Sequence, residues 1–185
     1  MDYKDRIHEI LGNLENTSSD ALKLAMEELA IQPEELEPIL KTEDDKPYYR
    51  KLLFKNERVE LLVMNWSQIE CAPHDHGSSF GWIQVINGTA KNTVYKVDGT
   101  KLPIELFTEF QENGKMFFAP EKGVHKMSVL NKSKLVTLHL YSPPITGMKV
   151  YDLNKCAACI VSDDCGAWWP EEQRQKVKEI QLEKN

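Results

Sequence analysis

The chain has 185 residues, the size of one ordinary domain that can bury a substantial core. Its formal charge is −6 at pH 7 and it has no basic runs, so we do not expect nucleic acid as a partner. No stretch approaches the roughly 18 apolar residues of a membrane span, and the first residues are polar. We therefore expect no membrane association, no signal peptide and a cytoplasmic location.

The first 45 residues predict an acidic, helical part, with 13 Asp and Glu residues against four Lys and Arg residues. Apolar residues recur at helical spacing over 3–14, and residues 17–20 have the composition of a helix start. Pro33 is typical of a first helical turn and predicts a third, short helix through Leu40. We interpret the acidic residues as solvated helical faces.

From residue 48 the apolar period changes from helical to strand-like. The expected strands, separated by turn signals such as Asn87-Gly88, span 48–55, 58–65, 80–87, 91–97, 105–110, 115–118, 126–130 and 134–141. Many short strands with regular turns are typical of a β-sandwich or a small barrel. Beyond them, Trp168-Trp169-Pro170 leads into a predicted polar helix over about 170–183.

Three of the five histidines, His74, His76 and His125, have the spacing of metal ligands. His74 and His76 are two residues apart, so on a strand both side chains point to the same face. A third imidazole from a distant strand would complete a facial triad of neutral nitrogen ligands, which leaves adjacent positions free for a substrate and a small molecule. The alternative is that the three histidines are ordinary polar surface residues.

Thr137, His139 and Tyr141 alternate with Leu138 and Leu140 in one predicted strand. The hydroxyl, imidazole and phenol therefore share one face, and the leucines share the other. Such a polar face predicts a hydrogen-bonded chain directed at something inside the fold. The alternative is a structural network that only satisfies buried polar groups.

Arg50 stands in a predicted strand, with Tyr48 on the same face. Its planar guanidinium suits a substrate carboxylate, which it can bind through two parallel charge-assisted hydrogen bonds. The alternative is a solvated surface arginine.

The histidine spacing resembles the two motifs of the cupin family. The matching residues are His74, His76, Gly88, Gly114, Pro120 and His125. The glutamate of the first motif falls on Gly81, and one glycine of the second motif lies one place late, at Gly123. The resemblance thus implies three histidine ligands and no carboxylate. Neutral ligands leave the full charge on a divalent ion, which favours an anionic thiolate substrate.

Residues 137–144 resemble the Ser-x-His-x-Tyr-Ser-Pro-Pro segment of the thiol dioxygenases, specifically of the cysteine dioxygenases, with Thr137 in place of the first serine. Tyr48 and Arg50 resemble that family's Tyr-x-Arg, where mercaptopropionate dioxygenases carry glutamine. The resemblance spans roughly residues 45–152. It implies a mainly β fold, a cupin-type small β-barrel (jelly roll) with N-terminal helices and a short C-terminal helix.

The same resemblance implies a non-haem Fe(II) enzyme that oxidises L-cysteine with O₂ to L-cysteine sulfinate. Its metal ligands are His74, His76 and His125. Arg50 would bind the substrate carboxylate, with help from Tyr48 or Tyr141. His139 and Thr137 would orient Tyr141.

Two features place the chain with bacterial-type members of that family. Mammalian members have a cysteine, cross-linked to the active-site tyrosine, at the position of Gly81, so we expect Tyr141 to be unmodified. Thr137 keeps the hydroxyl of the serine that it replaces. The resemblance also makes Ser142-Pro143 a candidate cis peptide.

We expect a single domain over 1–185 and a monomer, with a helical part at 1–45, the cupin barrel at 46–152 and a C-terminal extension at 153–185. Two alternatives are a dioxygenase for another small thiol, such as 3-mercaptopropionate, and a non-catalytic metal-binding cupin. A third is a thiol–disulfide protein that uses Cys156-x-x-Cys159, which we otherwise interpret as incidental loop cysteines.

Overall fold

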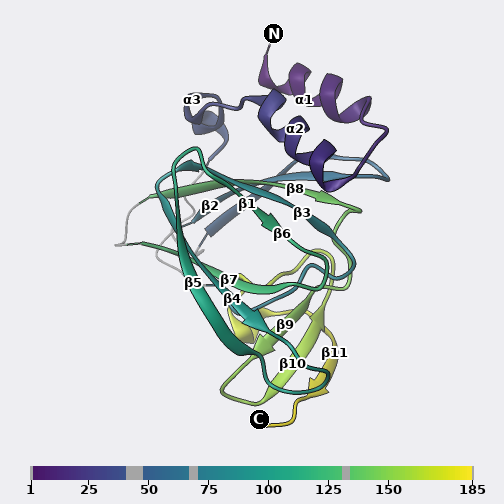
Figure 1. Ribbon diagram of the computed structural model, residues 1–185, viewed down its shortest axis with the longest axis vertical. Helices are drawn as coiled ribbons and strands as arrows, with labels where there is room; N and C mark the ends of the chain where they lie inside the picture. Colours follow the sequence, from purple (N-terminus) through teal and green to yellow (C-terminus); the bar gives the residue numbers. More distant parts are fainter. Residues whose placement is uncertain (1, 41–47, 67–70, 131–133, 185) are drawn as a thin grey trace.

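The computed structural model describes residues 2–40, 48–66, 71–130 and 134–184, without the side chains of Tyr48 and Tyr49 (Figure 1). The N-terminal part contains α1 (Tyr3–Gly12), α2 (Ser19–Leu29), α3 (Pro33–Leu36) and the 3₁₀ helix η1 (Glu37–Ile39). The hydroxyl of Ser18 caps α2 by accepting a hydrogen bond from the Ala21 N–H at 3.3 Å. None of the described helices is long and apolar enough to cross a membrane.

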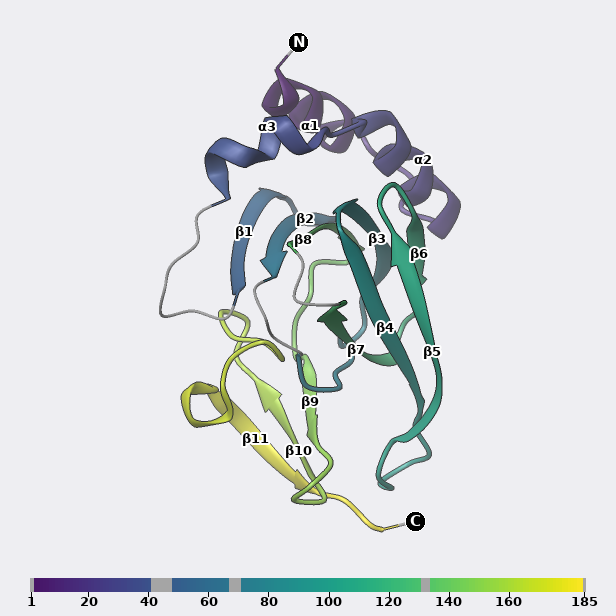
Figure 2. The same ribbon diagram turned by 90° about the vertical axis from the view of Figure 1, so that its left-hand side faces the viewer.

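Three antiparallel sheets follow. The five-stranded sheet has the order β1 (Tyr48–Lys55), β2 (Glu60–Trp66), β8 (Leu135–Ser142), β3 (Phe80–Asn87), β6 (Met116–Ala119). The second has the order β5 (Ile104–Glu112), β4 (Thr89–Lys96), β7 (Val124–Val129). The third has the order β11 (Lys176–Gln181), β10 (Ala157–Val161), β9 (Lys149–Asp152), and it lies at the end of the molecule opposite the helices (Figures 1 and 2).

The five-stranded sheet is buried on both faces at its centre, where β2 and β8 are buried throughout. Leu138 and Leu140 of β8 pack with the helices, whose own buried residues include Leu22 and Met26. Full burial of such a side chain contributes about 1.5–3 kcal/mol. The indole N–H of Trp82 in β3 also donates to the Ser19 carbonyl oxygen at 2.9 Å, which fixes α2 on the sheet.

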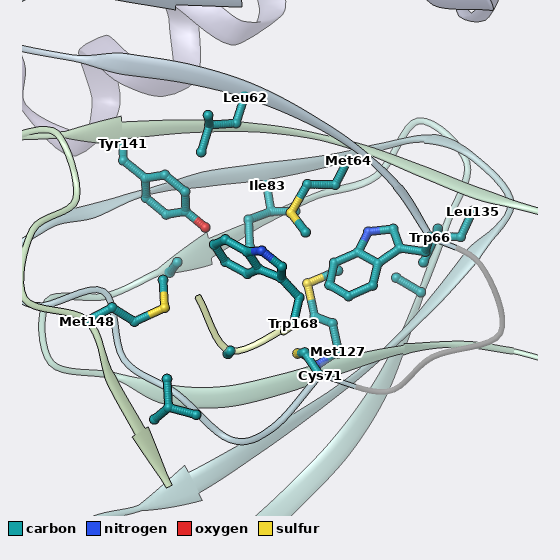
Figure 3. Close-up of a cluster of buried hydrophobic side chains, with 14 of the residues drawn as sticks. Leu62, Met64, Trp66, Cys71, Ile83, Met127, Leu135, Tyr141, Met148 and Trp168 are labelled. Carbon is teal, nitrogen blue, oxygen red and sulfur yellow. The ribbon is translucent and has the colours of Figure 1, made fainter. Parts of the chain in front are cut away.

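The other face of the same sheet encloses the main core. Leu62 and Ile83 pack there with Met127 of β7 and with Ala90 of β4 (Figure 3). Because strand side chains alternate, the leucines of β8 face the helices while Thr137, His139 and Tyr141 face this interior. The predicted polar face is therefore turned inward.

The prediction of a mainly β fold is confirmed, and each of the eight expected strands has a counterpart. The predicted C-terminal helix over 170–183 is wrong: the structure has a 3₁₀ turn, η2 (Glu171–Gln173), and then the strand β11. Ile180 and Leu182 are two residues apart and pack into one cluster, so the true period is that of a strand. The sequence analysis also missed β9 and β10. Ser142-Pro143 is cis.

Candidate metal centre

His74, His76 and His125 are buried together between the sheets, with one ring nitrogen of each within 4.8 Å of the others. His125 belongs to β7, and the backbones of His74 and His125 exchange two hydrogen bonds of 2.9 and 3.0 Å. His74 also bridges to Val150 of β9. The backbone ladder thus brings the distant third histidine of the sequence analysis beside the other two.

The hydrogen bonds at Nδ1 determine which nitrogen of each ring is available. His125 Nδ1 donates to the side-chain oxygen of Asn92 at 2.8 Å, and His74 Nδ1 donates to the Ala72 carbonyl at 2.9 Å. In a neutral ring the other nitrogen, Nε2, then carries a lone pair. Among the described residues, His76 Nδ1 is buried and has no hydrogen-bond partner.

The spacing of these lone pairs suits a shared ion. Nε2 of His125 and Nε2 of His76 are 3.3 Å apart. Two imidazole nitrogens that bind one metal at about 2.1 Å, at an angle of about 90–110°, are about 3.0–3.4 Å apart. The three-nitrogen set leaves further positions open on a six-coordinate ion. The residues present therefore fit a transition metal.

Burial lowers the pKa of all three imidazoles, and for His76 and His125 the neighbouring histidines lower it further. The rings are therefore neutral at physiological pH. The neutral imidazole is the form that binds a metal, so the site needs no deprotonation of histidine before loading.

A chain of hydrogen bonds leads to this cluster along β8. The indole N–H of Trp66 donates to Thr137 Oγ1 at 2.8 Å, and Thr137 Oγ1 lies 2.7 Å from His139 Nε2. His139 Nδ1 lies 3.0 Å from the Tyr141 hydroxyl, which lies 3.2 Å from His76 Nε2. Burial lowers the pKa of His139 to about 3 and raises the pKa of Tyr141 far above its ordinary value. Both side chains are therefore uncharged.

Arg50 lies on β1, close enough to this chain for its charge to lower the pKa of both His139 and Tyr141, although burial has the larger effect on each. Its guanidinium carbon is 5.2 Å from the centre of the Trp168 ring, and its Nε is buried without a hydrogen-bond partner in the described chain. A buried, unpaired guanidinium N–H is costly unless something binds it. The side chain of Tyr48, a predicted partner of Arg50, lies outside the described residues.

Gly81 stands beside Tyr141, since the two residues pair directly between β3 and β8. A Cβ atom at Gly81 would lie 2.8 Å from Cδ1 of Tyr141 and would collide with the Leu140 carbonyl oxygen. The four cysteines are all free thiols. That Tyr141 carries no thioether stays a prediction.

Asn92 and Trp168 were missed by the sequence analysis. Asn92 is buried on β4, and its amide bridges His125 and the Glu109 carboxylate, to which its Nδ2 donates at 3.0 Å. Asn92 lies within a predicted strand, but no local pattern distinguishes it from other strand residues. Trp168 lies in the region predicted to be a loop and the start of a helix.

Asn92→Ala should lower the affinity for a divalent transition metal by about 10–100-fold, because His125 loses the acceptor that fixes its ring. Competition between the protein and a chelator for Co²⁺ measures this affinity. Thr93→Ala is the control: Thr93 is also buried and loses a 2.8 Å hydrogen bond to Thr108, but on the opposite face of β4. Equal affinities of the two variants would contradict the role of Asn92.

Acid should destabilise the metal-free protein as the pH falls from about 6.5. The pKa of His139 is about 3 in the folded protein and 6.5 ordinarily, so the unfolded state binds the proton first. The stabilising effect is complete above the unfolded pKa and is lost as the pH falls toward the folded one. His139→Gln should reduce the slope of the unfolding free energy by up to about 1.4 kcal/mol per pH unit. Urea unfolding between pH 6.5 and 4 measures it.

Thr93→Ala changes a buried residue that carries no titratable group and should keep the wild-type slope. A wild-type slope in His139→Gln as well would show that His139 is not held neutral by burial.

Comparisons with known proteins place the chain in a family. The family model described as cysteine dioxygenase type I matches residues 3–154. Among curated proteins, cysteine dioxygenase type 1 of Danio rerio is 27% identical over 116 residues, which are 59% of this chain and 58% of that protein. The aligned part thus covers less than two thirds of the relative.

Similar solved structures include a protein with a double-stranded β-helix domain from Klebsiella pneumoniae, at 15% identity and a TM-score of 0.47, covering 63% of this chain and 94% of that one. Another is the cupin domain of Schizosaccharomyces pombe Cnp3, at 13% identity and a TM-score of 0.46, covering 57% of this chain and 70% of that one. The family match covers well over half of the chain. The protein therefore belongs to the cysteine dioxygenase type I family.

Proposed function

We propose that the protein is a non-haem Fe(II) dioxygenase that converts L-cysteine and O₂ into L-cysteine sulfinate, with both oxygen atoms added to sulfur. The observation that carries this proposal is the convergence of one ring nitrogen from each of three neutral imidazoles, with His76 Nε2 3.2 Å from the Tyr141 hydroxyl. The family membership supports the reaction class. Fe(II) is the proposed metal because imidazole ligands suit it and because the reaction uses dioxygen.

A divalent iron held by His74, His76 and His125 would bind the substrate thiolate and supply the oxygen chemistry. Because all three ligands are neutral, the site keeps a positive charge that favours the thiolate over the thiol.

Arg50 is the proposed binding group for the substrate carboxylate. Its guanidinium lies near Tyr141, and its buried Nε lacks a hydrogen-bond partner among the described residues. A carboxylate would satisfy that N–H through a charge-assisted hydrogen bond. Tyr48 remains a proposed second contact.

Tyr141 is the proposed proton-holding group at the reaction site. Its raised pKa keeps it a neutral phenol, and the 3.0 Å contact with His139 Nδ1 fixes the position of the oxygen. A neutral phenol donates a hydrogen bond to developing negative charge without transferring its proton irreversibly. Thr137 and His139 then act by orienting Tyr141.

We propose that none of the four cysteines of the chain has a redox role. Cys159 is buried in β10, and burial raises its pKa, which makes a reactive thiolate less available. All four cysteines are free, which agrees with the proposed cytoplasmic location.

A panel of thiols tests the proposal. The Fe(II)-loaded protein should consume O₂ with L-cysteine and release sulfinate, with less turnover of 3-mercaptopropionate and cysteamine. Faster turnover of 3-mercaptopropionate would identify a dioxygenase for that thiol. If the protein binds iron but consumes no oxygen with any thiol, the proposal is wrong and the protein is a non-catalytic metal-binding protein.

Arg50→Ala should raise the KM for L-cysteine by roughly 10–1,000-fold, because a charge-assisted hydrogen bond contributes about 1.5–3 kcal/mol and the guanidinium makes one or two. Cysteamine has no carboxylate, so its KM should rise far less. Steady-state oxygen uptake with both thiols measures the difference. Lys55→Ala removes an exposed cation from the same strand and serves as the control. Equal increases in KM for both thiols would show that Arg50 stabilises the structure of the site and does not bind the carboxylate.

A further inference from the structure

The segment that follows the family match returns to the site. The match ends at residue 154, but residues 162–170 carry Trp168 into the main core cluster. The Trp168 side chain is buried, with 7% of its surface exposed, and Figure 3 shows its ring between Tyr141 and Trp66. Residues beyond the range of the family match thus supply a side chain next to Tyr141.

Several hydrogen bonds hold this segment in place. The Ala72 N–H donates to the Ala167 carbonyl at 3.1 Å, which attaches the segment directly beside His74. Arg174 Nε donates to the Trp169 carbonyl at 2.9 Å. A Cβ atom at position 166 would collide with the Trp168 indole, so the ring folds back over Gly166 and needs a glycine there. Trp168 is therefore a fixed part of the site.

The Trp168 ring contacts the two groups that are proposed to handle substrate. Its centre lies 5.2 Å from the guanidinium carbon of Arg50, a cation–π distance. The Tyr141 hydroxyl points toward the same indole (Figure 3). An indole that covers the face of a guanidinium leaves the in-plane N–H groups for a carboxylate, and the buried Nε of Arg50 lacks a partner in the described chain.

The space beside Arg50 is small. A cavity of about 10 Å³ lies there, and its lining residues include Met148, Cys165 and Trp168. This volume holds about one water molecule. The indole therefore leaves little free space beside the guanidinium.

We propose that Trp168 is a specificity-determining residue that restricts the substrate to a short thiol carboxylate, by forming the wall between Arg50 and Tyr141. This inference rests on the proposed function, because it assumes that the substrate carboxylate binds at Arg50. One added methylene in a well-packed apolar pocket changes specificity by about 10–200-fold. L-Homocysteine, which is one methylene longer than L-cysteine, is therefore the probe.

Trp168→Ala should raise the ratio of kcat/KM for L-homocysteine to that for L-cysteine by about tenfold or more. Trp168→Phe keeps an aromatic ring and should shift the ratio less, by about threefold. Trp169→Phe changes the neighbouring, partly buried indole and should keep the wild-type ratio. Thermal unfolding shows whether each variant is folded. If Trp168→Ala does not fold, the ratio measured for Trp168→Phe tests the proposal.

Anaerobic calorimetry with the metal-loaded protein gives a second ratio, that of the two dissociation constants, which is independent of turnover and should shift in the same direction. An unchanged ratio in folded Trp168→Phe and Trp168→Ala overturns the assignment of Trp168. A wild-type protein that binds L-cysteine but never oxidises it overturns the proposed dioxygenase instead, while the shift in binding ratio still supports Trp168 as the wall. Loss of affinity for both thiols in equal proportion would show that Trp168 only supports Arg50.

Discussion

Three neutral imidazoles in one buried space are the constraint on which the rest of the structure depends. Burial favours the uncharged rings, and a ring N–H that is left over is costly unless the protein supplies an acceptor, as it does for two of the three. His74 uses a backbone carbonyl and His125 uses Asn92, which in turn donates to Glu109. The acceptor of His74 is a loop carbonyl two residues before it, whereas the acceptor of His125 lies on the neighbouring strand β4, so His125 is oriented only when β4 and β7 pair in the correct register.

The same constraint explains why the helices matter to a site that they do not touch. β8 is buried on both faces, with Leu138 and Leu140 toward the helices and His139 toward the metal ligands. Without α1 and α2, the leucine face would be exposed to water and the strand would lose much of the apolar burial that holds it. The helical layer thus stabilises the strand that places the Thr137–His139–Tyr141 chain.

Local patterns were strong enough to predict the helices, eight strands and the histidines that meet. Non-local pairing explains the failures. Lys176–Gln181 is polar and was predicted to be helical, but pairing with β10 makes it a strand, with Ile180 on its packed face. Asn92 could not be recognised either, because its role depends on strand pairing. It pairs with Glu109 on β5 and with Met127 on β7. Neither neighbour is visible in the local sequence.

The two ring nitrogens of His76 have different surroundings, and this difference bears on how Tyr141 acts. Its Nδ1 has no acceptor among the described residues, so packing orients the ring, which lies 4.7 Å from the Tyr141 ring between centres. Its Nε2 faces the Tyr141 hydroxyl at 3.2 Å. A metal bound at Nε2 uses the same lone pair that would accept the phenolic proton. His139 can donate through Nδ1 to the phenol oxygen, so with the lone pair of His76 taken by a metal the phenolic proton would have to point away from both histidines. Metal binding and the direction of the phenolic proton would therefore be coupled through one nitrogen.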